Sequence, residues 1–373
     1  MFDWKLISSD SHIVEPPDLW TERIDRRFRD RGPRVISEAD GDWWMIDGTR
    51  GNSFQGGAQA GKRFDRAEEL RPAARFSEVR PGAYRPAEFL RENEEDGIWA
   101  SVIYPTAGLQ LFRVPDLDLL SACFRAYNDW LAEFCRAAPE RLRGIALINV
   151  EDVDGAIREL SRVRKLGLTG GMITVAPQEE RSYDHAMYEP FWAAAQDLAA
   201  PIGLHIDTNR PAPHVVAESN RTSRAALLAN ADYWVRVSLG HLILEGVFER
   251  YPNLRVGSAE HELGWVPYFL DRLDYTYTQR ARRAHWHRYR SDALPSDFFR
   301  QNVFLSFQED AIGIRDRALI GVDCLMWGSD YPHTESTFPR SRVILERILE
   351  GVPPEERRQI TASNVARLYR FEC

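Results

Sequence analysis

Cysteine is scarce in this sequence, and its few cysteines form no recognisable pair. There are four in 373 residues, and none has the Cys-x-x-Cys spacing of a zinc or redox site. Cys123 and Cys135 fall in one predicted helix, too far apart along its axis to form a disulfide. We therefore expect free or buried thiols in a reducing cytoplasm, with no disulfide framework.

Long apolar runs and an excess of positive charge are also missing. No apolar stretch approaches the ~18 residues of a membrane span, and MFDWKLISSDSH lacks the basic start and apolar run of a signal peptide. Asp and Glu outnumber Lys and Arg by 56 to 48, for a net charge of -8. This balance argues against nucleic acid as the main partner. We expect a cytoplasmic protein that acts on a small molecule, away from membranes.

Short apolar runs, by contrast, recur along the whole chain. They lie at residues 5–11, 99–105, 144–150, 170–176, 201–207, 255–261, 302–308 and 324–330. They are almost continuously hydrophobic, as strands covered on both faces are. Amphipathic helical patterns, such as 121–138 and 154–167, separate them. This alternation predicts an α/β fold, a (β/α)₈ TIM barrel over residues 1–373 as one domain; an open doubly wound sheet is the alternative, but eight units suit closure better.

Residues 13–85 interrupt the alternation after the first strand. Residues 35–48 contain Asp-Gly between apolar runs and predict a hairpin. Residues 51–64 are rich in glycine and have neither helix nor strand period. An insertion of this length is typical of a lid or a dimer contact.

Polar residues stand where several predicted strands end, which is where barrel enzymes place their active groups. The ends of the first, fifth, sixth, seventh and eighth strands carry, in turn, Asp10 with His12, His205, Glu260 with His261, Glu309, and Asp330. Carboxylates that meet in one dry cavity repel each other unless a cation neutralises them. We therefore predict a metal site made of Asp10, His12, His205 and Asp330, with ligands that zinc, manganese and iron all accept.

The motifs that hold these residues resemble a known family. DSHIVEPPDLW, the strand of His205, GVFERYPNLRVGSAEHELGWVPYFLDRLD and WGSDYPHTESTFPRS together look like the amidohydrolase-related family. That family includes aminocarboxymuconate semialdehyde, resorcylate and carboxyvanillate decarboxylases. The sequence is most similar to the branch that opens with DSH followed by EP, many of whose members are described as metal-dependent hydrolases. The resemblance implies a barrel with one divalent metal ion, and a homodimer.

The resemblance also implies roles for individual residues. Asp330 would be both a metal ligand and a base, and His333 would support it from behind or be a simple loop residue. Asp10 departs from the His or Glu usual at its position but remains a ligand type. On the sixth strand, chemistry favours His261 as the acid–base group, whereas alignment favours Glu260.

The number of metal ions stays open at this point. Two-metal relatives use a modified lysine or a glutamate on the fourth strand, and TGGMITVAP has neither. This favours one ion. Glu260, His261 and Glu309 could still hold a second ion.

Hydrolysis of an ester, amide, lactone or thioester by a metal-activated water is the function we favour from the sequence, with Asp330 as the base. Nonoxidative decarboxylation of an aromatic or unsaturated acid is the alternative. It needs a cationic clamp, which Arg50, Arg63 or the basic run 279–290 could supply. A third possibility is a metal-binding barrel without catalysis.

Overall fold

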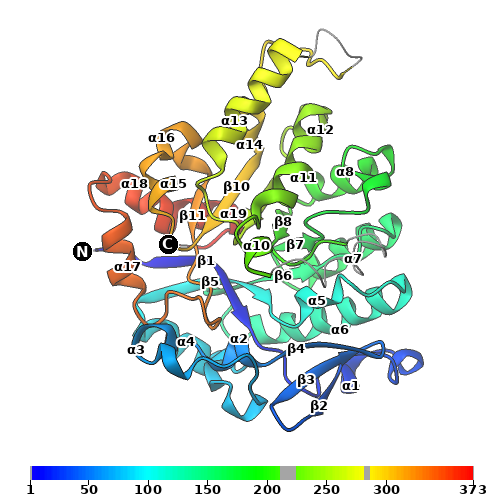
Figure 1. The fold of residues 1–373 in the computed structure, drawn as a ribbon. Coiled ribbons are helices and arrows are strands. Elements are labelled where there is room, and N and C mark those ends of the chain that lie inside the picture. Colours follow the sequence, from blue (N-terminus) through cyan, green and yellow to red (C-terminus); the bar gives the residue numbers. More distant parts are fainter. Residues whose placement is uncertain (1, 211–223, 281–285, 373) are drawn as a thin grey trace.

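The chain is built around a ring of parallel strands (Figure 1). In this computed structural model, the described residues are 2–210, 224–280 and 286–372. The eight barrel strands are β1 (Leu6–Ile13), β5 (Ile98–Pro105), β6 (Leu142–Leu147), β7 (Gly170–Ile173), β8 (Ile202–His205), β9 (Val256–Ala259), β10 (Val303–Phe307) and β11 (Leu325–Trp327). Each pairs in parallel with the next along the chain. They coincide with the eight apolar runs, so the predicted (β/α)₈ barrel is confirmed.

The segment that follows β11 closes the ring against β1. The backbone N–H of Asp330 donates to the carbonyl of Asp10 at 2.9 Å, and the N–H of His12 donates to the carbonyl of Tyr331 at 2.6 Å. The hydroxyl of Ser8 accepts the N–H of Ser329 at 2.9 Å. Closure therefore brings Asp10 and Asp330 side by side across the seam.

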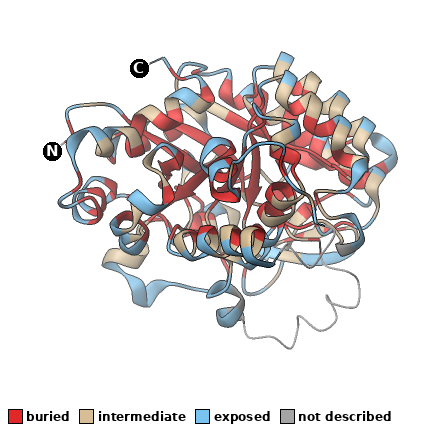
Figure 2. Cartoon of the chain, turned by 90° about the horizontal axis from the view of Figure 1, so that it is seen from above, coloured by how far each residue is buried: buried red, intermediate tan, exposed pale blue. Residues whose placement is uncertain are grey.

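Helices surround the barrel, with exposed residues concentrated on their outer surfaces (Figure 2). The longer ones are α4 (Pro86–Glu95), α6 (Leu117–Cys135), α7 (Val153–Lys165), α8 (Glu189–Asp197), α11 (Asp232–Leu244), α13 (Val266–Tyr275), α14 (Pro295–Asn302), α17 (Ser341–Ile348) and α19 (Asn364–Tyr369). The shorter ones are α1 (Leu19–Arg23), α2 (Gln55–Ala58), α3 (Lys62–Asp65), α5 (Gly108–Leu111), α10 (Arg224–Leu228), α12 (Val247–Arg250), α15 (Ala311–Arg315), α16 (Arg317–Ile320) and α18 (Pro354–Arg358). Side chains cap two predicted helices: Asp116 accepts from the first turn of α6, and Asp152 from that of α7. No helix within the described ranges is both long and apolar enough to span a bilayer.

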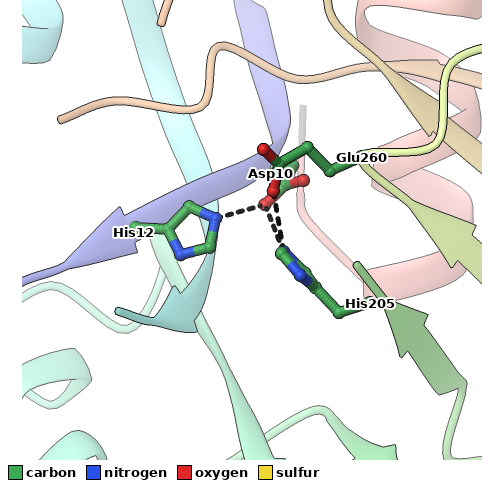
Figure 3. Close-up of side chains that lie close together, drawn as sticks. All are labelled: Asp10, His12, His205 and Glu260. Carbon is green, nitrogen blue, oxygen red and sulfur yellow. Dashed lines mark ion pairs between the residues drawn. The ribbon is translucent and has the colours of Figure 1, made fainter. Parts of the chain in front are cut away.

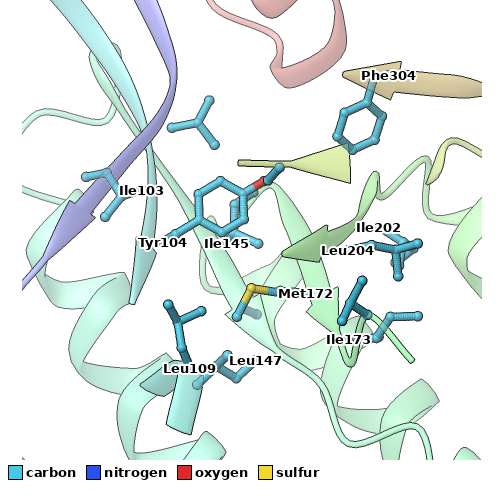
Figure 4. Packing of buried hydrophobic residues seen from close by; sticks show 14 of the residues in the cluster. Ile103, Tyr104, Leu109, Ile145, Leu147, Met172, Ile173, Ile202, Leu204 and Phe304 are labelled. Atoms are coloured by element: carbon cyan, nitrogen blue, oxygen red, sulfur yellow. The ribbon is translucent and has the colours of Figure 1, made fainter. Parts of the chain in front are cut away.

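Apolar side chains from neighbouring strands fill the barrel. Figure 4 shows Tyr104 of β5, Met172 of β7 and Leu204 of β8 among them, and all three are buried. The strands are buried on both faces, which explains why their sequences do not alternate with polar residues. The cysteines of the described part are buried and unpaired, as predicted.

The inserted segment after β1 carries a small antiparallel sheet of β2 (Arg34–Ser37), β3 (Asp42–Ile46) and β4 (Thr49–Ser53). The hairpin predicted around Asp-Gly is confirmed as β2–β3. Strand β4 was not predicted, because its exposed sequence TRGNS lacks an apolar pattern.

The prediction of neither helix nor strand in the glycine-rich segment 51–64 is wrong, since β4 extends into it and the short helices α2 and α3 form there. Tertiary contacts hold this part: the side chain of Gln59 bonds both the N–H and the carbonyl of Arg71. A Cβ added to Gly57 would overlap the side chain of Val14 at the end of β1. The insertion therefore packs closely against the mouth of the barrel.

Candidate functional site

Five of the predicted site residues converge at the carboxyl ends of the barrel strands. Asp10 and His12 lie on β1, and His205 ends β8. Glu260 directly follows β9, and Asp330 lies three residues after the end of β11. Figure 3 shows Asp10 and His12 from β1, His205 from β8 and Glu260 from the loop after β9 pointing toward one another. The shared mouth of the parallel strands gathers residues that are far apart in the sequence.

The ligand atoms of this cluster are within a few ångströms of each other. His12 Nε2 lies 3.3 Å from Oδ1 of both Asp10 and Asp330. His205 Nε2 lies 3.8 Å from Asp10 Oδ1 and 3.5 Å from Glu260 Oε2. Glu260 is 22% exposed, whereas the other four side chains are at most 1% exposed.

These atoms form two overlapping groups that could each hold a metal ion. The groups are Asp10, His12, His205 and Glu260, and His12, Glu260, Asp330 and His333, with ligand atoms within 4.8 Å of one another. Both oxygens of Asp10 and of Asp330, and Nε2 of both His12 and His205, are buried without a hydrogen-bond partner. Buried polar atoms without partners are costly, and a cation bound among them would satisfy several at once. The residues therefore fit a divalent metal site.

Backbone carbonyls set the direction of both imidazoles. His12 Nδ1 donates to the carbonyl of Pro105 at 2.7 Å, and His205 Nδ1 donates to that of Ile206 at 3.1 Å. A carbonyl can only accept, so in each neutral ring Nδ1 carries the proton. The lone pair of each Nε2 is then free to face the cluster, as a metal ligand requires.

The surroundings lower the pKa of one carboxylate in the cluster and raise the pKa of the other two. Burial opposes ionisation of Asp10, but the imidazoles of His12 and His205 outweigh it and hold its pKa well below the usual range. Burial raises the pKa of Asp330 to about 7; His12 lowers it in part, and Asp10 raises it further. Burial, followed by the charges of Asp330 and Asp10, raises the pKa of Glu260 well above its ordinary value. The protein alone thus resists three negative charges here, and a cation would remove that conflict.

The two candidates on the sixth strand have different surroundings. The backbone of Glu260 is left-handed, with φ of 62°, and its carboxylate reaches the cluster. His261 Nδ1 is 3.0 Å from the hydroxyl of Ser258, and its Nε2 is buried without a partner. Burial and then the nearby His205 lower the pKa of His261 to about 3. Within the described residues, only Glu260 of this pair belongs to a ligand group.

The other two predicted residues, His333 and Glu309, lie in different places relative to the cluster. His333 lies beside the cluster, with Nδ1 2.8 Å from Asp330 Oδ1 and its ring 4.0 Å from that of His12. Glu309 instead pairs with Arg63 of α3 and, at 2.7 Å, with Arg347 of α17. Glu309 is therefore placed to hold the insertion to the barrel, outside both ligand groups.

The three candidates for a cationic clamp also lie at different distances from the barrel mouth or outside the described residues. Arg63 donates to the carbonyl of Ser336, in the loop after β11, at 3.0 Å. Arg50 pairs at 3.0 Å with Glu38 within the small sheet. Part of the basic run, residues 281–285, lies outside the described residues. Arg63 is thus the candidate that contacts the loops at the mouth.

Sequence reasoning missed the role of Glu15. Its fully buried carboxylate accepts the N–H groups of Ala107 at 2.8 Å and Gly108 at 2.9 Å, just after β5. Burial raises the pKa of Glu15 to about 7, although these N–H groups lower it. The EP of DSHIVEP was visible, but no sequence spacing reveals a partner in the turn after another strand.

Solved structures share this fold along the whole chain. An amidohydrolase from Mycobacterium avium subsp. paratuberculosis K-10 has a TM-score of 0.79 and 21% identity, and the match covers 99% of this chain and 98% of that one. A dihydroxybenzoic acid decarboxylase from Polaromonas sp. JS666, with bound manganese and the inhibitor 2-nitroresorcinol, has a TM-score of 0.65 and 20% identity, covering 98% and 97%. At these identities the similarity establishes the barrel fold.

A curated relative is similar in sequence as well. The gamma-resorcylate decarboxylase of Polaromonas sp. is 29% identical over 223 residues, which are 56% of this chain. The chain spans 65% of the length of that relative. The hydrolysis that we favoured from the sequence is therefore wrong: the matching curated relatives are decarboxylases, and these findings support the alternative reading. Membership of the DSH–EP branch stays a prediction.

The family assignment rests on a longer match. Residues 86–371, which include every barrel strand except β1, match the amidohydrolase family. The matched part contains His205, Glu260 and Asp330, and β1 adds Asp10 and His12 to the same mouth. The chain belongs to the amidohydrolase family.

Proposed function

We propose that this protein is a metal-dependent, nonoxidative decarboxylase of an aromatic carboxylic acid that carries a hydroxyl group beside the carboxylate. The observation that carries the proposal is the buried cluster of unpartnered carboxylate and imidazole atoms at the barrel mouth. The decarboxylases among its relatives support the choice of reaction.

Asp10, His12, His205 and Asp330, which lie in contact through His12 and Asp10, would hold one divalent ion, for which manganese, zinc and iron are all suitable. When bound, the ion supplies positive charge that can hold a substrate carboxylate and a neighbouring oxygen. The protein contributes the direction of both imidazoles through the carbonyls of Pro105 and Ile206. A second ion, which the overlapping ligand groups leave open, is not needed for this reaction.

Glu260 is the side chain that we assign to proton transfer. Decarboxylation breaks the bond between the ring carbon and the carboxylate, so CO₂ leaves and the electron pair stays on that carbon, which then takes a proton. Glu260 is the most exposed of the five clustered side chains, so it can meet both substrate and cluster. His261, buried beside Ser258, is the second candidate for the same step.

The insertion 13–85 would act as a lid over this site. Gly57 is packed against Val14 just after β1, and Arg63 bonds Glu309 after β10 and the carbonyl of Ser336. A lid held in this way would exclude water from the developing negative charge on the ring. The homodimer implied by the family resemblance stays a prediction.

The test is CO₂ release by the manganese-loaded protein. The panel consists of 2,6-dihydroxybenzoate and its isomers, with benzoate as a control that lacks the neighbouring hydroxyl and aryl esters as a control for hydrolysis. We expect CO₂ only from acids with the neighbouring hydroxyl, and none from Asp330→Asn. Ester cleavage without CO₂ release would contradict the proposal, and so would tight metal binding without turnover of any compound.

A further inference from the structure

The turn that follows β5 contacts the site at consecutive positions. The carbonyl of Pro105 accepts from His12 Nδ1, and the hydroxyl of Thr106 lies 3.0 Å from His333 Nε2. The next two N–H groups bind the carboxylate of Glu15, which fixes the turn to β1. One turn therefore holds both a proposed metal ligand and the imidazole beside Asp330.

The hydrogen bonds of His333 can be assigned from its neighbours. Nδ1 lies 2.8 Å from Asp330 Oδ1, and an ionised carboxylate can only accept. In the neutral ring Nδ1 therefore carries the proton, and Nε2 must accept. The hydroxyl of Thr106 is the donor that Nε2 meets. Asp330 thus selects the tautomer of His333, and the hydroxyl of Thr106, which can donate to Nε2, fixes the orientation of the ring.

The side chains beside the Asp330 carboxylate include His12, Gln308 and His333. The backbone of Asp330 is left-handed, with φ of 56°, and both carboxylate oxygens are buried. His12 Nε2, at 3.3 Å from Oδ1, is itself a proposed metal ligand. His333 Nδ1, at 2.8 Å, is closer to Oδ1 and can hold it in place.

We propose that Thr106 is a positioning residue: its hydroxyl fixes His333, and His333 holds the Asp330 carboxylate in the direction from which it binds the metal. The proposal rests on the proposed function only for Asp330 being a metal ligand. Groups that orient metal ligands in this way typically change metal affinity by about 10- to 100-fold when they are removed.

The first test is the affinity of the full chain for Mn²⁺, measured by electron paramagnetic resonance of the free ion. Thr106→Val keeps the side-chain shape but removes the hydroxyl, and we expect it to weaken binding by about 10- to 100-fold. Thr106→Ser keeps the hydroxyl and should bind within a few-fold of the native chain. Thr169→Val is the matched control, because Thr169 is also half-buried and bonds only the carbonyl of Gly144 just before β7. Native affinity in Thr106→Val, or equal losses in the serine or control variants, would overturn the proposal.

A double-mutant cycle tests the route through His333. His333→Asn retains an amide N–H near the position of Nδ1 but has no atom that reaches Thr106. Adding Thr106→Val to His333→Asn should therefore weaken Mn²⁺ binding no further, whereas an additive loss would overturn the route. Unfolding temperatures of the metal-free variants should match the native chain.

The role of Thr106 and the proposed decarboxylase activity can fail independently in these experiments. A chain that binds Mn²⁺ tightly, loses affinity in Thr106→Val and releases no CO₂ would overturn the decarboxylase alone. A native chain without affinity for Mn²⁺ would overturn both.

Discussion

Glu15→Gln offers a quantitative test of how the turn after β5 is held. Glu15 is fully buried, and its pKa is raised from 4.5 to about 7, mainly by burial. Below pH 4.5 the carboxyl is protonated in both the folded and the unfolded chain. Between pH 4.5 and 7 the unfolded chain releases the proton while the folded chain keeps it. Stability from this group is therefore present at low pH and lost as pH rises through about 7.

The size of the effect follows from the shift. A difference of roughly 2.5 pKa units corresponds to about 3 kcal/mol, an order-of-magnitude figure for the stability lost between pH 4.5 and 8. Glutamine cannot ionise, but its NH₂ group must face the N–H of Ala107 or Gly108, which costs about 1–3 kcal/mol at every pH. Glu15→Gln should thus be less stable than the native chain at pH 5 and approach or exceed it at pH 8.

Urea unfolding of the metal-free protein, followed by tryptophan fluorescence at several pH values, measures this difference. Other buried acids, such as Asp96 and Glu262, also have a pKa raised to about 7, but they are common to both chains and cancel in the comparison. Asp96→Asn provides an independent variant in which a different acid is removed. Parallel stability curves for Glu15→Gln and the native chain from pH 5 to 8 would refute the reasoning.

Four further predictions concern the metal, the lid and helix α11. Asp330→Asn should lower metal content to a small fraction of the native value, measured per chain by plasma mass spectrometry, because it removes a charged ligand atom. Chelation should lower the unfolding temperature, since an ion at one hundred times its dissociation constant stabilises the fold by about 2.7 kcal/mol; an unchanged temperature in calorimetry would speak against a folded-state metal site. Gly57→Ala should destabilise the insertion by about 1–3 kcal/mol through overlap with Val14. Gly240→Ala, which meets nothing within 4 Å on α11, should instead stabilise by about 0.5–1 kcal/mol, with urea unfolding as the readout for both glycines.

The barrel and much of the candidate site could be predicted from the sequence because they follow from local rules. Strands covered on both faces appear in the sequence as apolar runs. Barrel enzymes place active groups where strands end, and this led to the choice of Asp10, His12, His205 and Asp330. In the structure His12 lies beside both aspartates, and His205 lies beside Asp10.

What could not be predicted depends on backbone turns and distant partners. That Glu260 rather than His261 joins the ligand groups follows a left-handed residue after β9, where the alternation of side chains no longer holds. Glu309 ends a strand as expected, but Arg63 from the insertion draws it away from the cluster. The predicted reaction, hydrolysis, was wrong for a chemical reason. The same metal ligands serve hydrolysis and decarboxylation, and only the relatives distinguish the two.

The seam between β1 and the segment after β11 links metal acquisition to protein synthesis. Asp10 and Asp330 come from opposite sides of that seam, joined by backbone hydrogen bonds between segments more than three hundred residues apart. A nascent chain still lacking residue 330 has three of the four proposed ligands and no closed barrel. Such a chain would bind the proposed ion only weakly, so tight loading is expected only once the chain has been synthesised past β11 and the ring has closed.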